Sequence, residues 1–269
     1  MDRIEKIKKL NRLLLEDLPE YVQETVRFED NLESQRRLLR SLMNVRYPGG
    51  ELNPEYLCLQ DELLSEEREE KGVVDVMQLP PVNTDRRISI WQGDITRLKA
   101  DAIVNAANSA MLGCFVPCHA CIDNAIHSAA GLQLREECAA LMRVQGYDEP
   151  VGGAKITQGY NLPAKHVLHT VGPVIETEVT EEKRRMLESC YVSCMELAEA
   201  YQLKSIAFCC ISTGVFRFPN RLAAEIAVQA VWVIQGFKKW CLMYLRIWIS
   251  ISMRICWDER SDIQLPGFS

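Results

Sequence analysis

The first 72 residues combine charged residues with apolar positions that recur at helical spacing. These positions are Leu10, Leu13, Leu14, Leu15, Leu38, Leu39, Leu42 and Met43. A Pro-Gly-Gly break at 48–50 interrupts the pattern, which resumes over 57–71 with a strongly acidic face. The pattern predicts an N-terminal extension of two to four amphipathic helices over residues 1–72. Because their apolar faces need a partner surface, we expect these helices to pack on the domain that follows.

From about residue 73 short apolar runs alternate with segments of helical periodicity. Strands are predicted at 88–91, 102–104, 155–157, 166–171 and 205–211. Helices are predicted at 124–143 with a break at Gly131, at 181–201 and at 221–235. Strands separated by helices of this length predict a three-layer α/β/α domain with a mostly parallel sheet, which we assign to residues 73–269.

The last segment, residues 237–269, is atypical of such a domain. It holds three of the five tryptophans of the chain and shows no clear periodicity. Two interpretations of this segment remain open, a divergent tail and an altered reading frame. Within the segment, Met243 to Ile251 is the candidate for a further strand.

Composition and charge narrow the classes of function. The hydrophobic fraction of 48% and charged fraction of 25% are ordinary for a soluble globular protein, and the net charge of −6 argues against nucleic acid as a partner. The charged N-terminus lacks the apolar core of a signal peptide, and no run reaches the roughly 18 apolar residues of a membrane span. We therefore expect a cytoplasmic protein with no membrane partner.

The chain has eleven cysteines, which is many for a protein expected in the cytoplasm, where disulfides are rare. Six of them lie in apolar runs, where a reduced cysteine is a small core residue: Cys58, Cys138, Cys190, Cys194, Cys209 and Cys210. His166 and His169 share one predicted strand on opposite faces, so we expect core or edge histidines rather than ligands of one metal.

Three loops follow predicted strands at the edge where α/β sheets bind ligands. Gly93-Asp94-Ile95-Thr96 offers a carboxylate that can accept from an exocyclic amine, although most Gly-Asp pairs are simply turns. In Asn105-Ala106-Ala107-Asn108, two asparagines flank two small residues, and their side-chain amides suit sugar hydroxyls. The alternative is that an Asn here caps the next turn. The third loop, 211–219, begins Ile-Ser-Thr-Gly-Val-Phe and can present main-chain N–H groups to phosphate oxygens.

A fourth loop concentrates metal-ligating side chains. Cys114, Cys118, His119 and Cys121 fall within eight residues, and thiolate with imidazole is a ligand set that zinc prefers. A cysteine-rich loop in a cysteine-rich chain is the alternative. Four protein ligands indicate a structural zinc and three leave a position for water or substrate. Because Cys118 and His119 are adjacent, binding of both to one ion would strain the backbone.

Taken together and in this order, the loops resemble those of the macrodomain family. The resemblance covers roughly residues 73–236 and includes Asp101-Ala-Ile-Val-Asn-Ala-Ala-Asn108 and Ala130-Gly131. It implies a mixed, mostly parallel sheet and an ADP-ribose site. It further implies that Asp94 and Ile95 hold the adenine, that Asn108 contacts the distal ribose, and that Ser212, Thr213, Gly214, Val215 and Phe216 hold the diphosphate. Arg217 departs from the glycine that many macrodomains have there.

The cysteine-bearing loop and the N-terminal extension resemble a zinc-dependent group of microbial macrodomains. That resemblance implies one Zn²⁺ per chain, held by Cys114, His119 and Cys121, with Cys118 as a bystander. Ile122 and Asp123 follow the last ligand, and Asp123 would orient a water or a ribose hydroxyl. His127 is expected to support or pack against the site rather than to bind metal.

The function that this resemblance implies is removal of mono-ADP-ribose from modified proteins, with Asp123 and Asn108 as catalytic residues and a zinc that acidifies a water. Relatives are often encoded beside a sirtuin-type transferase and a lipoyl-carrier protein, so a modified lipoyl-carrier protein is an expected partner. The alternative is a reader that binds ADP-ribose without cleaving it and uses zinc to brace the loop.

Overall fold

The computed structural model describes residues 1–83, 85–233 and 239–244. Its main sheet has six strands in the order β2 (Ile88–Gln92), β8 (Lys239–Tyr244), β7 (Ser205–Phe208), β4 (Ala102–Ala107), β6 (His166–Val171) and β5 (Ala154–Gln158). Neighbouring strands are parallel except for β5, which runs antiparallel to β6. The sheet is therefore mixed and mostly parallel, as predicted. A separate parallel pair joins β1 (Val74–Asp75) to β3 (Leu98–Lys99).

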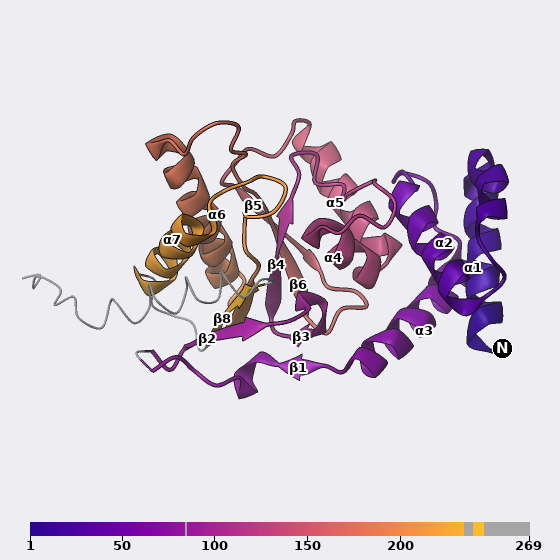
Figure 1. The fold of residues 1–269 in the computed structure, drawn as a ribbon, viewed down its shortest axis with the longest axis horizontal. Coiled ribbons are helices and arrows are strands. Elements are labelled where there is room, and N and C mark those ends of the chain that lie inside the picture. The colour runs from indigo at the N-terminus through magenta and orange to yellow at the C-terminus, as the bar shows by residue number, and fades with distance from the viewer. Residues whose placement is uncertain (84, 234–238, 245–269) are drawn as a thin grey trace, which may run out of the picture.

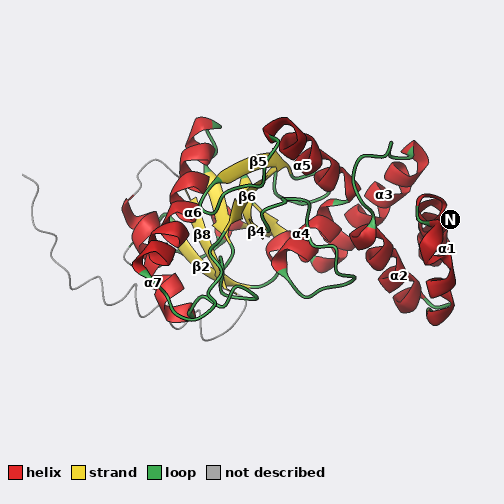
Figure 2. Ribbon diagram, turned by 90° about the horizontal axis from the view of Figure 1, so that it is seen from above, coloured by secondary structure: helices red, strands yellow, loops and turns green. Residues whose placement is uncertain are grey.

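Helices cover both faces of the main sheet (Figure 1, Figure 2). On one face α4 (Ile122–Ala130) packs on β4, and α5 (Leu132–Gln145) packs on β5. On the other face α6 (Glu181–Ala200) contacts β5 and β6, and α7 (Asn220–Val233) packs beside it. This arrangement confirms the predicted three-layer α/β/α architecture.

Local chemistry explains where α4 and α5 begin and end. Cys121 caps α4, because its Sγ accepts from the N–H of Asn124 at 3.4 Å. Gly131 separates the two helices with a φ of +100°, a left-handed conformation that favours glycine. A Cβ at this position would also meet Nε2 of Gln60 at 2.6 Å, so the break predicted at Gly131 serves a close approach of α3 (Pro54–Lys71).

The N-terminal extension consists of α1 (Arg3–Asp17), a 3-10 helix (Pro19–Arg27), α2 (Leu32–Val45) and α3. The expectation that these helices pack on the following domain is met only in part, through α2 and α3. Their apolar faces form a core of their own, to which Leu132 is the one fully buried contributor from the described residues beyond 72. Ion pairs between α1 and α3 add to it, such as Arg3 with Glu70 at 2.6 Å. The extension touches the rest of the molecule mainly through polar contacts of α2 and α3.

The C-terminal strand lies earlier than expected. Strand β8 spans Lys239–Tyr244 and is inserted between β2 and β7, so it shares only its last two residues with the predicted strand at Met243–Ile251. The remainder of that prediction, and the tail from 245 to 269, lies outside the described residues. The insertion places three parallel strands side by side at this half of the sheet.

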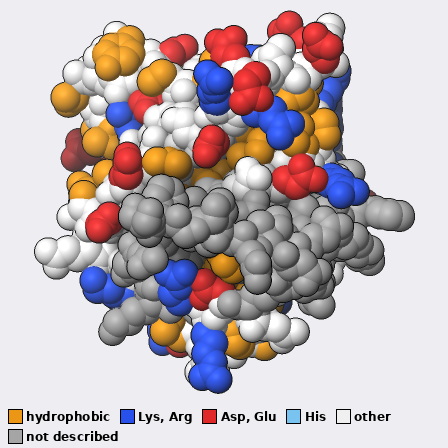
Figure 3. Space-filling view, turned by 90° about the vertical axis from the view of Figure 1, so that its left-hand side faces the viewer, with side chains coloured by type: hydrophobic (Ala, Val, Ile, Leu, Met, Phe, Trp, Pro, Cys, Tyr) orange, Lys and Arg blue, Asp and Glu red, His pale blue; other side chains and the backbone are white. Residues whose placement is uncertain are grey.

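Two of the six cysteines expected in the core are not fully buried. Cys58 is exposed on α3 and Cys210 is half-buried, whereas Cys138, Cys190, Cys194 and Cys209 are buried as free thiols. Acidic and basic side chains are interspersed on the α6–α7 side of the molecule (Figure 3). No helix within the described ranges is long and apolar enough to cross a bilayer.

Candidate functional site

The predicted ligand loops meet at one edge of the sheet. Since β2, β4 and β7 all have parallel neighbours, the loops that follow them leave from the same edge. These loops begin with Asp94, Asn108 and the segment around Ser212 (Figure 1). The topology therefore brings the three predicted ligand segments to one end of the domain.

Asp94 and Ile95 differ in what they can offer a ligand. Asp94 is exposed and begins a short 3-10 helix (Ile95–Arg97), where its Oδ1 accepts from the Thr96 N–H at 3.0 Å and hydroxyl at 2.7 Å. The Ile95 side chain is fully buried in the main core. Ile95 can therefore meet a ligand only through its main chain, while the Asp94 carboxylate has free lone pairs.

The loop after β7 exposes main-chain donors. Within the described residues, no main-chain acceptor is recorded for the N–H groups of Gly214, Val215 and Phe216, and both Gly214 and Val215 are exposed. The loop is held at its base, where the Phe218 N–H donates to the Ser212 carbonyl at 2.9 Å. Successive unpaired N–H groups in a turn form a concave anion site. The exposed Arg217 adds a positive charge beside it.

Cys114, His119 and Cys121 come together as predicted from the resemblance. Their ligand atoms all lie within 4.8 Å of one another, and Cys114 Sγ is 3.5 Å from His119 Nδ1. Zn–S bonds of about 2.3 Å and Zn–N bonds of about 2.1 Å in a tetrahedron require S···N separations near 3.6 Å. The donor set and the spacing of this group therefore fit a zinc ion, and all three residues are half-buried.

Cys118 points away from that group. Its Sγ lies 3.4 Å from the Ser41 hydroxyl and 3.6 Å from the Arg37 carbonyl, both on α2. Its backbone is left-handed, with a φ of +52°. This placement supports a three-residue ligand set, in line with the sequence argument that adjacent residues 118 and 119 are poor partners for one ion.

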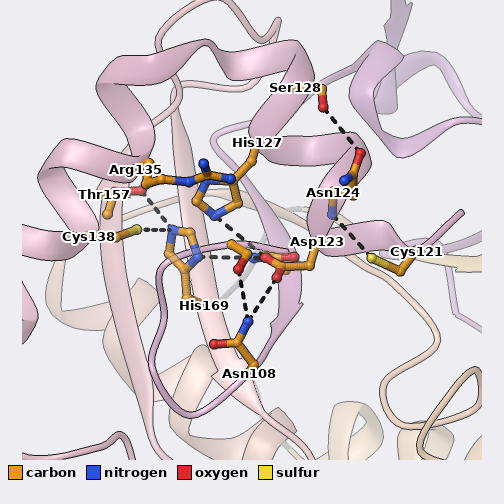
Figure 4. Close-up of polar contacts among 12 residues, drawn as sticks. Asn108, Cys121, Asp123, Asn124, His127, Ser128, Arg135, Cys138, Thr157 and His169 are labelled. Atoms are coloured by element: carbon orange, nitrogen blue, oxygen red, sulfur yellow. Dashed lines mark hydrogen bonds and ion pairs between the residues drawn. The ribbon is translucent and has the colours of Figure 1, made fainter. Parts of the chain in front are cut away.

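Asp123, in the first turn of α4, lies beside this group and is almost fully buried (Figure 4). Its Oδ1 accepts from Asn105 Nδ2 at 2.8 Å and its Oδ2 from Asn108 Nδ2 at 3.4 Å. Burial raises the pKa of the carboxyl to about 6, and the hydrogen bond from Asn105 and the charge of Arg135 oppose that rise. The two amides fix the orientation of the carboxylate. Ile122, its neighbour, is half-buried at the start of the helix.

A second group of possible metal ligands, His127, Cys138 and His169, is buried behind Asp123. Asn105 Nδ2 lies 3.2 Å from His169 Nδ1, and the Thr157 hydroxyl lies 2.9 Å from His169 Nε2. Because an amide NH₂ only donates, Nδ1 is the acceptor and Nε2 carries the proton. Burial lowers the pKa of His169 to about 3. The hydrogen bonds therefore explain His169 as a neutral core histidine, whereas neither ring nitrogen of His127 has a hydrogen-bond partner among the described residues.

Sequence reasoning assigned Asn105 incorrectly and missed Arg135. Asn105 lies inside β4 with no exposed surface, so it orients Asp123 instead of meeting a sugar. A lone polar residue in an otherwise apolar strand was the available signal. His166 retains a buried Nδ1 without a hydrogen-bond partner, contrary to the expectation of a satisfied histidine. His127 packs against the site at 3.5 Å from Asp123, as expected.

Comparison with known proteins agrees with this geometry. Residues 104–227 match the family described as Macro domain. A protein-ADP-ribose hydrolase from Treponema medium is 53% identical over 221 residues, covering 81% of this chain and 83% of the relative. A protein-ADP-ribose hydrolase from Staphylococcus aureus strain MSSA476 is 53% identical over 205 residues, covering 76% of this chain and 74% of the relative. A Trypanosoma brucei macrodomain solved in complex with ADP-ribose is 32% identical with a TM-score of 0.61, covering 81% of this chain and 94% of that one.

The chain therefore belongs to the macrodomain family. Both of these relatives, each 53% identical to this chain, are protein-ADP-ribose hydrolases, which confirms the prediction of an enzyme of that class.

Proposed function

We propose that this chain is a zinc-dependent hydrolase that removes mono-ADP-ribose from modified proteins. The observation that carries the zinc dependence is the group of Cys114, His119 and Cys121, whose donor atoms lie within 4.8 Å of one another beside Asp123. The hydrolase class itself follows from the relatives. Residues 1–72 form the helical extension and 73–269 the macrodomain in this proposal.

Each loop has a part in holding ADP-ribose. The exposed Asp94 carboxylate would accept from the adenine amine, and the Ile95 N–H would donate to the ring. The unpaired N–H groups of residues 214–216 would cradle the diphosphate, with Ser212 and Thr213 shaping the turn. These contacts leave the distal ribose at Asn108 and Asp123, next to the cysteine-bearing loop.

The chain's own residues would orient the reaction at the distal ribose. Asn108 and Asn105 donate to the two oxygens of Asp123, so the remaining carboxylate lone pairs have fixed directions for a ribose hydroxyl or an attacking water. Zinc, when bound to Cys114, His119 and Cys121, would supply Lewis-acid polarisation of an oxygen at this position. The bond that breaks joins the anomeric carbon to a side-chain atom of the modified protein.

The protein partner is an ADP-ribosylated protein, and the resemblance to the zinc-dependent group extends the proposal to a modified lipoyl-carrier protein. The expected place of action is the cytoplasm.

Release of ADP-ribose from a mono-ADP-ribosylated protein, with zinc content measured on the same samples, tests the proposal. We expect the wild type and Cys118→Ala to hold one zinc and to release ADP-ribose at similar rates, with Cys58→Ala as the matched control. Both should lose activity on chelation and regain it with zinc. A chain that binds ADP-ribose and zinc but releases nothing would instead be a reader, and loss of zinc from Cys118→Ala would make Cys118 a fourth ligand.

A further inference from the structure

The N-terminal extension contacts the cysteine-bearing loop through specific hydrogen bonds and an aromatic contact. The loop from 108 to 121 has no helix or strand of its own, so its conformation depends on outside partners. Two of its residues, each next to a proposed zinc ligand, contact α2 or the segment that directly follows it. We propose that α2 is a positioning element for the zinc ligands, with Asn44 as its central residue. This inference rests on the proposed function for its zinc and on the contacts below for its geometry.

Both polar atoms of the Asn44 side chain form hydrogen bonds, one with the loop and the other with α4. The residue has no exposed surface. Its Oδ1 accepts from the Cys118 N–H at 2.9 Å, and its Nδ2 donates to the Ser128 hydroxyl at 3.1 Å. Cys118 holds a left-handed backbone that non-glycine residues rarely adopt, so a partner for its N–H stabilises that conformation. His119 follows directly, and the direction of its ring therefore depends on the peptide that Asn44 holds.

The other end of the loop is held near the C-terminus of α2. Phe115, next to Cys114, stacks on Tyr47 with ring centres 5.6 Å apart and planes at 17°. The guanidinium of Arg135 lies 4.5 Å from the centre of the same Phe115 ring. Tyr47 therefore supports Phe115, the residue beside the first proposed zinc ligand.

Arg135 also fixes the end of α2 in place. Its Nη1 donates to the carbonyl oxygens of Met43, Asn44 and Arg46 at 2.7 to 2.9 Å. The last carbonyls of a helix have no partner within the helix, so a buried guanidinium satisfies them directly. Arg135 comes from α5, and the end of α2 is thus tied to the macrodomain core rather than only resting on it.

A third contact runs through Asn124, in the first part of α4 (Figure 4). Arg40 on α2 donates to Asn124 Oδ1 at 2.7 Å, while Asn124 Nδ2 donates to the Val116 carbonyl in the middle of the loop at 3.0 Å. The Asn124 N–H in turn donates to Cys121 Sγ at 3.4 Å. Through Asn124, α2 is therefore linked to Val116 in the loop and to Cys121, the last proposed ligand.

The test compares Asn44→Ala with Asn11→Ala. Asn11 is a matched control because it is equally buried, and its Nδ2 donates to Gln35 inside the extension, away from the loop. Apo-protein is titrated with zinc against a chromophoric chelator, and amide exchange of residues 112–121 is measured in the same apo samples. We expect zinc affinity to fall about 10-fold or more in Asn44→Ala, as for other residues that orient ligands, with faster exchange in the loop. Asn11→Ala should stay within about threefold of wild type.

Tyr47→Ala keeps the inference testable if Asn44→Ala does not fold, because Tyr47 is 69% exposed. Its zinc affinity should fall by more than that of Asn11→Ala, with faster exchange at Phe115. Equal losses in Asn44→Ala and Asn11→Ala, or unchanged exchange in the loop, would overturn the positioning role. A wild type that binds no zinc but whose loop exchange still responds to Asn44→Ala would contradict the proposed zinc dependence and leave the positioning role standing.

Discussion

Two groups of histidine and cysteine lie on either side of Asp123 and have opposite chemistry. Cys114, His119 and Cys121 lie in a loop, half-buried, with donor atoms directed at one another. In the other group, His169 is fully buried and already hydrogen-bonded to Asn105 and Thr157. The same residue types therefore form a candidate metal site in one place and, in the other, a buried group in which His169 is a neutral, hydrogen-bonded core histidine. Exposure and prior hydrogen bonds make the difference, more than residue type or spacing.

Replacing one cysteine in each group should separate them most clearly. Cys121→Ser removes a proposed ligand, so we expect zinc affinity to fall by more than about 100-fold. Cys138→Ser removes a buried thiol 3.8 Å from His169 Nε2 and should keep one zinc per chain. Zinc content of the purified variants, measured by elemental analysis, checks both expectations. Loss of zinc from Cys138→Ser with retention in Cys121→Ser would reverse the assignment.

Asp123 connects the two groups, and its substitution should affect catalysis more than binding. We expect Asp123→Ala to lower kcat by about 100-fold or more, since the carboxylate is proposed to orient the attacking water or ribose hydroxyl. Affinity for free ADP-ribose should change by less than about 10-fold, because the adenine and diphosphate contacts remain. Single-turnover release and calorimetric binding give the two numbers. A purely structural Asp123 would show equal losses in both, accompanied by unfolding.

Burial of His169 predicts a pH dependence of the free energy of unfolding. His169 has a pKa of about 3 in the folded protein and about 6.5 when unfolded, so below pH 6.5 the unfolded chain binds a proton that the native state excludes. Its contribution therefore reduces the free energy of unfolding as the pH falls, by up to about 1.4 kcal/mol per pH unit. His169→Gln should remove that part of the slope.

Urea unfolding of wild type and His169→Gln at pH 7.0 and 5.5 measures this effect. His127 is also buried with a lowered pKa, so the variant keeps part of the wild-type slope. An unchanged slope in the variant would show that His169 is charged in the native state, against the hydrogen-bond pattern that makes it neutral.

Most of the fold could be predicted from the local pattern of apolar and polar residues. Short apolar runs predicted the strands around Ile103 and Leu168, because these strands are buried along almost their whole length. Helical periodicity predicted the long helix over 181–200. The packing of the extension on itself was not readable, since amphipathic faces do not specify their partner. Strand β8 was placed too late because the segment after 236 has no clear alternation.

The residues of the candidate site could be predicted only where they lie close together in the sequence. Cys114, His119 and Cys121 form a dense local cluster, and Asp94 and Asn108 follow strands directly. The contacts made by Asn44 and Arg135 span more than 70 residues along the chain, and one sequence carries no information on which distant polar residues meet. The sequence also did not show that burial of the Ile95 side chain limits this residue to main-chain contacts with a ligand.

The central claim is that one zinc, held by the half-buried group, is needed for hydrolysis. Stepwise return of zinc to metal-free protein, with ADP-ribose release measured at each step, tests it most directly. We expect activity to rise linearly and to level off at one zinc per chain, and to stay absent in Cys121→Ser. Full activity of the metal-free protein, or a plateau reached only at two zinc ions, would contradict the account.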